Sequence, residues 1–329
     1  MELLSDSKFY GPAHVCDYLH KTAGITCNLV SSNTNFGELF RGVNQLVIGT
    51  GENDENILAD IVSTASRRGI LITAIIDAPT SIRERLQSIS EYPSELINRV
   101  VFSDPVCREK LRQLGFQDEN LFLVRNPQID YVEKFLHNRK LSAYQSSGNI
   151  SSLPGKKLLF ISEISDGMCS SEFKKSEDYT LLGNDIGASG RTQVVLEEVI
   201  SVLEDIAEDI SLSLRMHPKD NINKYLKYIS KIDYFSIDEH PLDAVFQADL
   251  VVGLTSSLLS EAAAMGKPVL SVVPRKKEAK WLGQFVSPAI PTVWTRKNLS
   301  KELNLLVQRG VSETQRTDNE RPCLLDVLR

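Results

Sequence analysis

The chain has 329 residues and a formal net charge of −6, which is long enough for two domains that each bury a core. Basic residues do not gather into the cluster that a duplex-binding surface needs, so we expect no nucleic-acid partner. No stretch reaches the roughly 20 apolar residues of a membrane-spanning helix, and the first residues lack the pattern of a secretory signal, so we expect a cytoplasmic protein.

The first half of the chain alternates buried strands with helices, which predicts a parallel sheet covered by helices. Pro105 at a first helical turn and Gly115 just past its end are typical helix boundaries. We expect an N-terminal domain over residues 1–145. Its strands cover 25–31, 45–49, 71–77, 99–104 and 121–127, and its helices cover 12–22, 55–69 and 105–115.

Residues 142–156 are rich in serine and glycine and have the composition of a linker. The same alternation then restarts, which predicts a second domain over 156–310, followed by a polar tail over 311–329 with a short docking helix at 323–329. The predicted strands cover 157–162, 210–216, 234–238, 249–253 and 267–273, and the helices cover 193–207, 241–248 and 256–266.

Functional side chains should follow the strands, because ligands of open parallel sheets bind beyond the carboxyl ends of the strands. In the second half, these positions carry hydroxyls, an imidazole and charged groups. The residues that we select are Glu163, His217, Pro218, Thr255, Ser256, Ser257 and Arg275.

A strand that ends on a glycine leads to three hydroxyl residues at the start of the helix at 256–266, which favours an anion site there. The alternative is ordinary N-capping by Thr255 or Ser256 without any ligand. Glu261 lies one turn further on, where its carboxylate could accept hydrogen bonds from ribose hydroxyls; otherwise it is a solvated helix residue.

His217 ends the strand that should neighbour this loop, and Pro218 fixes the local path of the chain. An imidazole can bind a phosphate and stabilise a departing nucleotide, so His217 is a candidate catalytic residue. The alternative is a packed or surface histidine. His240, in a loop before Pro241, is a weaker candidate for recognition of a base.

Two segments, "RMHPKD" and "ADLVVGLTSSLLSEAAAMGKPVLSVVP" (248–274), resemble the nucleotide-binding half of GT-B glycosyltransferases and their relatives. The similar enzymes include bacterial capsule and polysialic acid (sialyltransferase-like) transferases, the CDP-glycerol transferase-like enzymes of teichoic acid synthesis, and the UDP-N-acetylglucosamine 2-epimerase group. In such transferases a His-Pro pair and a Ser-Ser pair hold the donor phosphate, and these pairs match His217-Pro218 and Ser256-Ser257. The segments "GILITAIIDAP", "RVVFSDPVCREKLRQLGF" and "VRNPQID" resemble the acceptor-side domain.

This resemblance implies an α/β fold in which two Rossmann-like, doubly wound parallel-sheet domains face each other across a cleft. It implies an inverting, metal-independent transferase for surface polysaccharide, with a nucleotide sugar as the substrate and no further cofactor. The resemblance includes enzymes that use CMP-linked sugars, so the donor could be CMP-linked. The acceptor would be a glycan or a lipid-linked glycan, and the enzyme would contact the inner membrane peripherally. Arg275 would assist the phosphate clamp.

Two other functions stay open on the same fold. One is a UDP-sugar 2-epimerase or hydrolase, although the serine loop lacks the Gly-Gly of many UDP-sugar enzymes. The other is a binding protein without catalysis, because no acidic triplet of the kind that carries the base in some sialyltransferases occurs in the chain.

A transferase needs a base for the acceptor hydroxyl, and the first domain offers three carboxylates. Asp77 and Asp104 each end a strand, and Glu52 follows another. Each of them could instead be an N-cap, a role that Asp104 before Pro105 fits especially well. We favour Asp77. We interpret Arg85 as a surface helix residue rather than a ligand for an anionic acceptor.

Overall fold

The computed structural model describes residues 2–6, 27–30, 40–50, 57–76, 79, 81–145, 155–164, 175–184, 188, 190–218, 220–282, 286–287, 289–308, 315–316 and 320–328. The chain divides into two compact units. Unit 1 is Met1–Tyr131 with Asp318–Arg329, and unit 2 is Val132–Thr317. The division falls inside helix α7 (Pro127–Gln145), upstream of the linker predicted from composition, and the last residues belong to unit 1.

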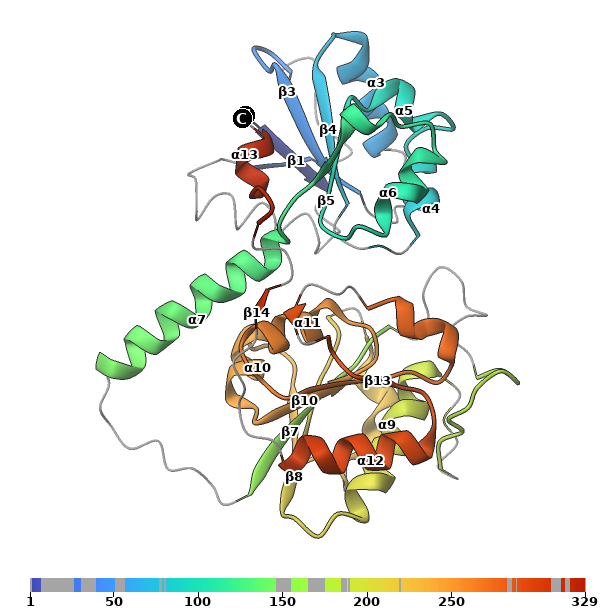
Figure 1. The fold of residues 1–329 in the computed structure, drawn as a ribbon, viewed down its shortest axis with the longest axis vertical. Helices are drawn as coiled ribbons and strands as arrows, with labels where there is room; N and C mark the ends of the chain where they lie inside the picture. The colour runs from blue at the N-terminus through green and yellow to red at the C-terminus, as the bar shows by residue number, and fades with distance from the viewer. Residues whose placement is uncertain are drawn as a thin grey trace. The chain divides into compact units, whose positions relative to one another are not determined.

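Unit 1 contains a parallel sheet with the strand order β2-β1-β3-β4-β5-β6 (Figure 1). The reversal of order between β1 and β3 makes this a doubly wound sheet. The strands are β1 (Glu2–Asp6), β2 (Cys27–Val30), β3 (Gln45–Gly49), β4 (Leu71–Ile76), β5 (Arg99–Phe102) and β6 (Leu121–Leu123). The helices are α3 (Ile57–Arg67), α4 (Ile82–Gln87), α5 (Pro93–Leu96) and α6 (Cys107–Arg112), with a 3₁₀ turn η1 at Asp118–Asn120.

The end of the chain is part of the core of unit 1. Helix α13 (Leu324–Leu328) buries Leu324 and Leu328 against Val47, Ile75 and Val101 of three neighbouring strands. Two hydrogen bonds hold the segment that leads into α13. Arg125 N donates to Pro322 O (2.9 Å), and Arg321 Nη1 donates to Ser103 O (3.2 Å).

Unit 2 contains a second parallel sheet with the order β13-β11-β10-β7-β8-β9. Its chain starts in the middle, moves outward through β8 and β9, and returns to the other side with β10, which is the Rossmann order 3-2-1-4-5-6. The switch point therefore lies between β7 and β10. The strands are β7 (Lys156–Ile161), β8 (Ile210–Arg215), β9 (Tyr234–Ser236), β10 (Leu250–Gly253), β11 (Val269–Val272) and β13 (Thr292–Val293).

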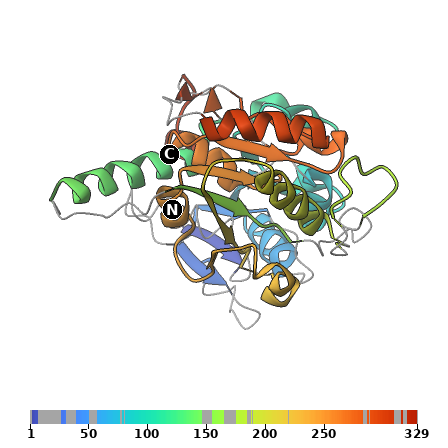
Figure 2. The ribbon, with the colours of Figure 1, turned by 90° about the horizontal axis from the view of Figure 1, so that it is seen from below.

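The helices of unit 2 are α9 (Arg191–Glu204), α10 (Pro241–Gln247), α11 (Ser257–Ala264) and α12 (Arg296–Gln308), with 3₁₀ turns η2 (Ile222–Lys224), η3 (Leu226–Tyr228) and η4 (Lys276–Lys280). A separate two-stranded antiparallel ribbon pairs β12 (Val286–Ser287) with β14 (Gln315–Arg316). Helices α9 and α12 pack against each other, and α12 lies along β11 (Figure 2).

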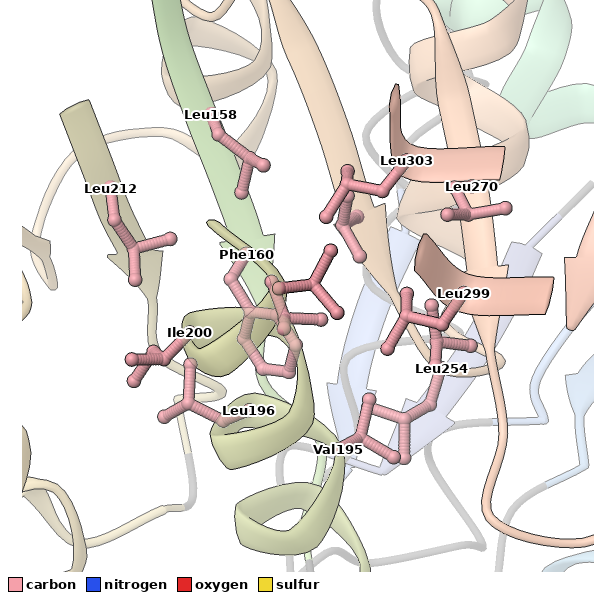
Figure 3. Close-up of a cluster of buried hydrophobic side chains, with 14 of the residues drawn as sticks. Leu158, Phe160, Val195, Leu196, Ile200, Leu212, Leu254, Leu270, Leu299 and Leu303 are labelled. Carbon is pink, nitrogen blue, oxygen red and sulfur yellow. The ribbon is translucent and has the colours of Figure 1, made fainter. Parts of the chain in front are cut away.

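The main core of unit 2 fills the space between the sheet and these two helices. Alternate strand residues such as Leu158, Phe160 and Leu270 point toward Leu196 of α9 and Leu303 of α12 (Figure 3). The period of two along each strand and of three to four along each helix brings both apolar faces together. The remaining strand residues face α10 and α11, which contact β7, β10 and β11.

The part of α7 that belongs to unit 2 packs against the start of α10. Phe135 stacks on the ring of His240 at 5.9 Å, and Arg139 forms an ion pair with Asp243. His240 also caps α10, because its Nδ1 accepts the N–H of Leu242 at 3.2 Å. In the described part of the chain, no helix has the length and apolar character needed to cross a membrane.

Candidate functional site

The ends of β8, β7 and β10 lie in register at one edge of the second sheet. Ile161 of β7 pairs with Arg215 of β8 on one side and with Gly253 of β10 on the other. Glu163, His217 and Thr255 are each two residues beyond these pairs, so they lie at the same level. A strand spacing of about 4.8 Å puts the backbones at 217 and 255 roughly 10 Å apart. This edge contains the switch point, where ligands of such sheets bind.

Two consecutive residues after β7 hold the loops on both sides. Ser162 Oγ accepts the N–H of His217 at 2.9 Å. The Glu163 carboxylate accepts the N–H of Thr255, and the Thr255 hydroxyl lies 3.1 Å from Glu163 Oε2. The loop after β8 and the loop after β10 are thus tied to one dipeptide between them.

The segment after β8 forms a tight turn that presents His217. Asp220 N donates to His217 O at 2.9 Å, a hydrogen bond that closes a β-turn with Pro218 in the second position, where the fixed φ of proline fits. The Asp220 carboxylate in turn accepts from Tyr225 Oη at 2.6 Å and pairs with Lys224 at 2.9 Å. His217 is half-buried on this braced turn.

Ser256 and Ser257 have different local roles at the start of α11. Ser256 is the N-cap, since its Oγ accepts the N–H of Leu258 at 3.3 Å. Ser257 is exposed at the first helical position. Gly253 lets α11 approach the sheet, because a Cβ there would lie 3.2 Å from both Ile161 Cβ and Leu259 Cδ2.

Arg191 is an unpredicted member of this region. It is the first residue of α9 and is 1% exposed. Its three nitrogens each contact a different residue: Nη1 donates to Glu163 Oε2 at 2.5 Å, Nη2 to Thr255 Oγ1 at 3.1 Å, and Nε to Glu278 Oε2. Glu278, which is fully buried, also accepts from Arg275 Nε.

These contacts define a charge network of Glu163, Arg191, Arg275 and Glu278, in which Glu163 is half-buried and the other three are buried. Its two guanidinium groups face two carboxylates. Arg275 is 3% exposed and also lies 3.8 Å from Asp178. The structure therefore brings Glu163, Thr255 and Arg275 together, as members or contacts of this network.

The electrostatics of the network keep Arg191 charged. Burial works to lower the pKa of its guanidinium, but the carboxylates of Glu163 and Glu278 outweigh burial, and the pKa lies above its usual value. Burial likewise raises the pKa of the neighbouring Tyr179 to about 12, so this phenol is neutral at physiological pH. The ring of Tyr179 lies under the Arg275 guanidinium at 5.1 Å.

Glu261 lies one turn after Ser257 on α11 and is 6% exposed, so it is not a solvated helix residue. Positions four apart lie on one helix face, which puts the Glu261 side chain beside Ser257. No group of three histidine, cysteine or acidic side chains in the described ranges is placed to hold a metal ion.

The candidates in unit 1 differ in their surroundings. Asp77 and Glu52 lie outside the described residues. Asp104 is 8% exposed, and its Oδ1 accepts the N–H of Val106 at 2.9 Å, a contact typical of a turn or helix start. The interpretation of Arg85 as a surface residue is wrong: it is 6% exposed, and its Nη2 donates to Thr50 O at 2.7 Å.

Sequence reasoning missed Arg191 because its partners are distant in the chain. Glu163, Thr255 and Glu278 lie 28, 64 and 87 positions away. The available signal was the placement of an arginine at the start of the helix that follows the central strand, where the Rossmann order directs the chain to the switch point.

No family model and no curated protein sequence matches this chain. Solved structures do. A UDP-GlcNAc 2-epimerase of Methanocaldococcus jannaschii, in complex with UDP-GlcNAc and UDP, is 13% identical over 97% of this chain and 95% of that chain, with a TM-score of 0.57. The UDP-GlcNAc 2-epimerase of Neisseria meningitidis, bound to UDP-GlcNAc, is 12% identical over 94% and 92%, with a TM-score of 0.56.

A third similar structure is the wall teichoic acid polymerase TagF with CDPG, which is 10% identical over 94% of this chain and 80% of that chain, with a TM-score of 0.53. At these identities the likeness establishes the fold. The chain has a GT-B fold of two Rossmann-like parallel-sheet domains, and the prediction of two doubly wound parallel-sheet domains is confirmed.

Proposed function

We propose that this protein is a cytoplasmic, metal-independent, inverting glycosyltransferase that binds the phosphate of a nucleotide-activated sugar at the strand ends of unit 2. The observation that carries the proposal is the tethering of the His217 turn and the Ser256–Ser257 loop to Ser162 and Glu163 between them. This arrangement fixes an imidazole and a helix start on either side of the switch point. The similar structures that bind UDP-GlcNAc and CDPG support the class of ligand.

The charge of the phosphate would be offset by His217 and by the start of α11, rather than by the buried arginines. Arg191 and Arg275 already face Glu163 and Glu278, so their charges are balanced inside the protein. A helix start offers N–H groups and a partial positive charge, and Ser257 adds an exposed hydroxyl. In the transfer step, a protonated His217 would stabilise the charge that develops on the departing nucleotide phosphate.

We propose that Glu261 lies close enough to this phosphate site to contact the ribose. The buried carboxylate shares a helix face with Ser257, where it can accept hydrogen bonds from the ribose hydroxyls next to the phosphate. For the base that deprotonates the acceptor we propose Asp77, because Oδ1 of the Asp104 carboxylate already accepts the N–H of Val106, a contact that fits a capping role. An Asp77→Asn variant should then bind the nucleotide normally and lose sugar transfer.

A thermal-shift panel with CMP, CDP, UDP and GDP tests the proposal. We expect at least one of these nucleotides to raise the melting temperature, since a ligand that binds only the folded state stabilises it. His217→Ala should reduce that shift. The absence of a shift with all four nucleotides would contradict the proposal.

The second candidate function is a 2-epimerase or hydrolase of UDP-sugars, which the two epimerase structures favour. It requires no acceptor. Incubating the protein with UDP-GlcNAc alone tests this function: release of UDP or formation of the epimer would establish it, and an unchanged sugar nucleotide would count against it. A binding protein without catalysis would bind a nucleotide and also leave UDP-GlcNAc unchanged.

A further inference from the structure

We propose that Arg191 is a positioning residue for the phosphate site, which it controls through Glu163 and Thr255. This inference rests on the proposed function, because it concerns the loop that would bind the nucleotide phosphate. One arginine side chain joins three loops of unit 2. Arg191 at the start of α9 contacts Glu163 after β7, Thr255 after β10, and Glu278 in η4 after β11.

The charge balance of the network indicates a geometric role. Two guanidinium groups and two carboxylates leave no net charge with which to attract a phosphate. A buried ion pair is a weak source of stability, because desolvation of both partners offsets their attraction. Arg191 is nevertheless almost completely buried, with its guanidinium 5.3 Å from the centre of the Trp281 ring. What the network does supply is a fixed relation between three loops.

The contact to Thr255 connects this network to the phosphate-binding loop. Thr255 directly precedes the N-cap, and its N–H and hydroxyl are both directed to Glu163. The next two N–H groups are those of Ser256 and Ser257. The structure gives Leu258 N and Leu259 N partners at the helix cap, and within the described chain it gives none to the N–H groups of Ser256 and Ser257. Fixing Thr255 therefore fixes the donors that remain for a ligand.

The guanidinium geometry explains why this position requires an arginine. Nε, Nη1 and Nη2 lie in one plane and point in different directions, so one side chain can serve three acceptors at once. A lysine retains the positive charge but has a single nitrogen and cannot hold Glu163, Thr255 and Glu278 in the same way. Charge and positioning can therefore be separated by Arg191→Lys.

The experiment measures nucleotide affinity by titration calorimetry, using the nucleotide from the CMP, CDP, UDP and GDP panel that binds the unaltered protein most tightly. Melting temperatures are recorded in parallel. We expect Arg191→Lys to weaken binding by about tenfold or more in protein that is still folded at the assay temperature, because the loop loses its fixed geometry. Glu197→Gln is the matched control.

Glu197 is a fully buried carboxylate on the same helix, and it accepts from Tyr228 Oη (2.6 Å) and Asn184 N (2.9 Å), outside the network. Its glutamine variant should lower the melting temperature while the nucleotide dissociation constant stays within twofold. An equal loss of affinity in both variants would show a general structural effect and overturn the proposal.

A second pair of variants keeps the test decisive if Arg191→Lys does not fold. Thr255→Val has nearly the same shape but lacks the hydroxyl that contacts Arg191 and Glu163, whereas Thr255→Ser retains it. We expect weakened binding in the valine variant and near-normal binding in the serine variant. Equal affinities in the two variants would refute the positioning role. If the unaltered protein binds none of the four nucleotides, the proposed function fails. If it binds one of them and these variants bind it with unchanged affinity, only the positioning role fails.

Discussion

Replacing Ser256 and Ser257 singly by alanine separates helix capping from ligand binding at adjacent residues. Ser256 Oγ accepts the N–H of Leu258, so Ser256→Ala should destabilise unit 2 by about 1 kcal/mol. In a domain of this size, this corresponds to a fall of about 2–4 °C in melting temperature. Ser257 is exposed at the first helical position, and Ser257→Ala should change stability by less than about 0.5 kcal/mol.

The effects on binding should run in the opposite order. A hydrogen bond from the Ser257 hydroxyl to a charged phosphate is worth about 1.5–3 kcal/mol, so its loss should weaken nucleotide binding about tenfold to a hundredfold. Differential scanning calorimetry measures the first effect and titration calorimetry the second, with the same two proteins. Unchanged affinity in Ser257→Ala would refute the assignment of this hydroxyl to the phosphate, and an unchanged melting temperature in Ser256→Ala would refute the capping argument.

Three further predictions concern packing: two for a buried thiol in unit 1 and one for a close contact in unit 2. Burial, together with the negative charge of Asp104, raises the pKa of Cys107 from 9.0 to about 12. In the native protein, Cys107 should therefore resist alkylation by iodoacetamide at pH 8, whereas the half-buried Cys323 should be alkylated. Peptide mass spectrometry measures both. Because the unfolded thiol loses its proton first, the contribution of Cys107 to stability should decline as the pH rises from about 9 through 12, and urea unfolding of Cys107→Ala should show a smaller decline. In unit 2, Gly253→Ala brings a Cβ within 3.2 Å of Ile161 and Leu259, so urea unfolding should show a loss of about 1–3 kcal/mol; no loss would mean that α11 does not approach the sheet closely.

The regular alternation of the chain predicts much of the fold because buried parallel strands are continuous apolar runs. The strand at 45–49 has the predicted bounds, and the order of strands and helices from α9 to β11 follows the apolar pattern. Strand β1 (Glu2–Asp6) was missed because its sequence, ELLSD, is short and half polar. Helix α12 was also missed, although its buried Leu299, Leu303 and Leu306 have helical spacing.

The site could be predicted only in part, for a physical reason. The rule that ligands bind at strand ends places His217 and Thr255 at one edge without any coordinates. This rule does not reveal which side chains already form hydrogen bonds or ion pairs inside the protein. Arginine is usually a surface residue, but Arg85 and Arg191 are both buried. Each forms hydrogen bonds with a residue more than 25 positions away in the chain. Such pairing depends on the tertiary fold, which local patterns do not encode.

The most direct test of the central claim is a crystal structure of the protein with the nucleotide that gives the largest thermal shift. We expect phosphate oxygens within hydrogen-bond distance of the His217 imidazole and of the N–H or hydroxyl of Ser257, next to the loops that Ser162 and Glu163 hold. A nucleotide whose phosphate lies away from both of these loops would contradict it.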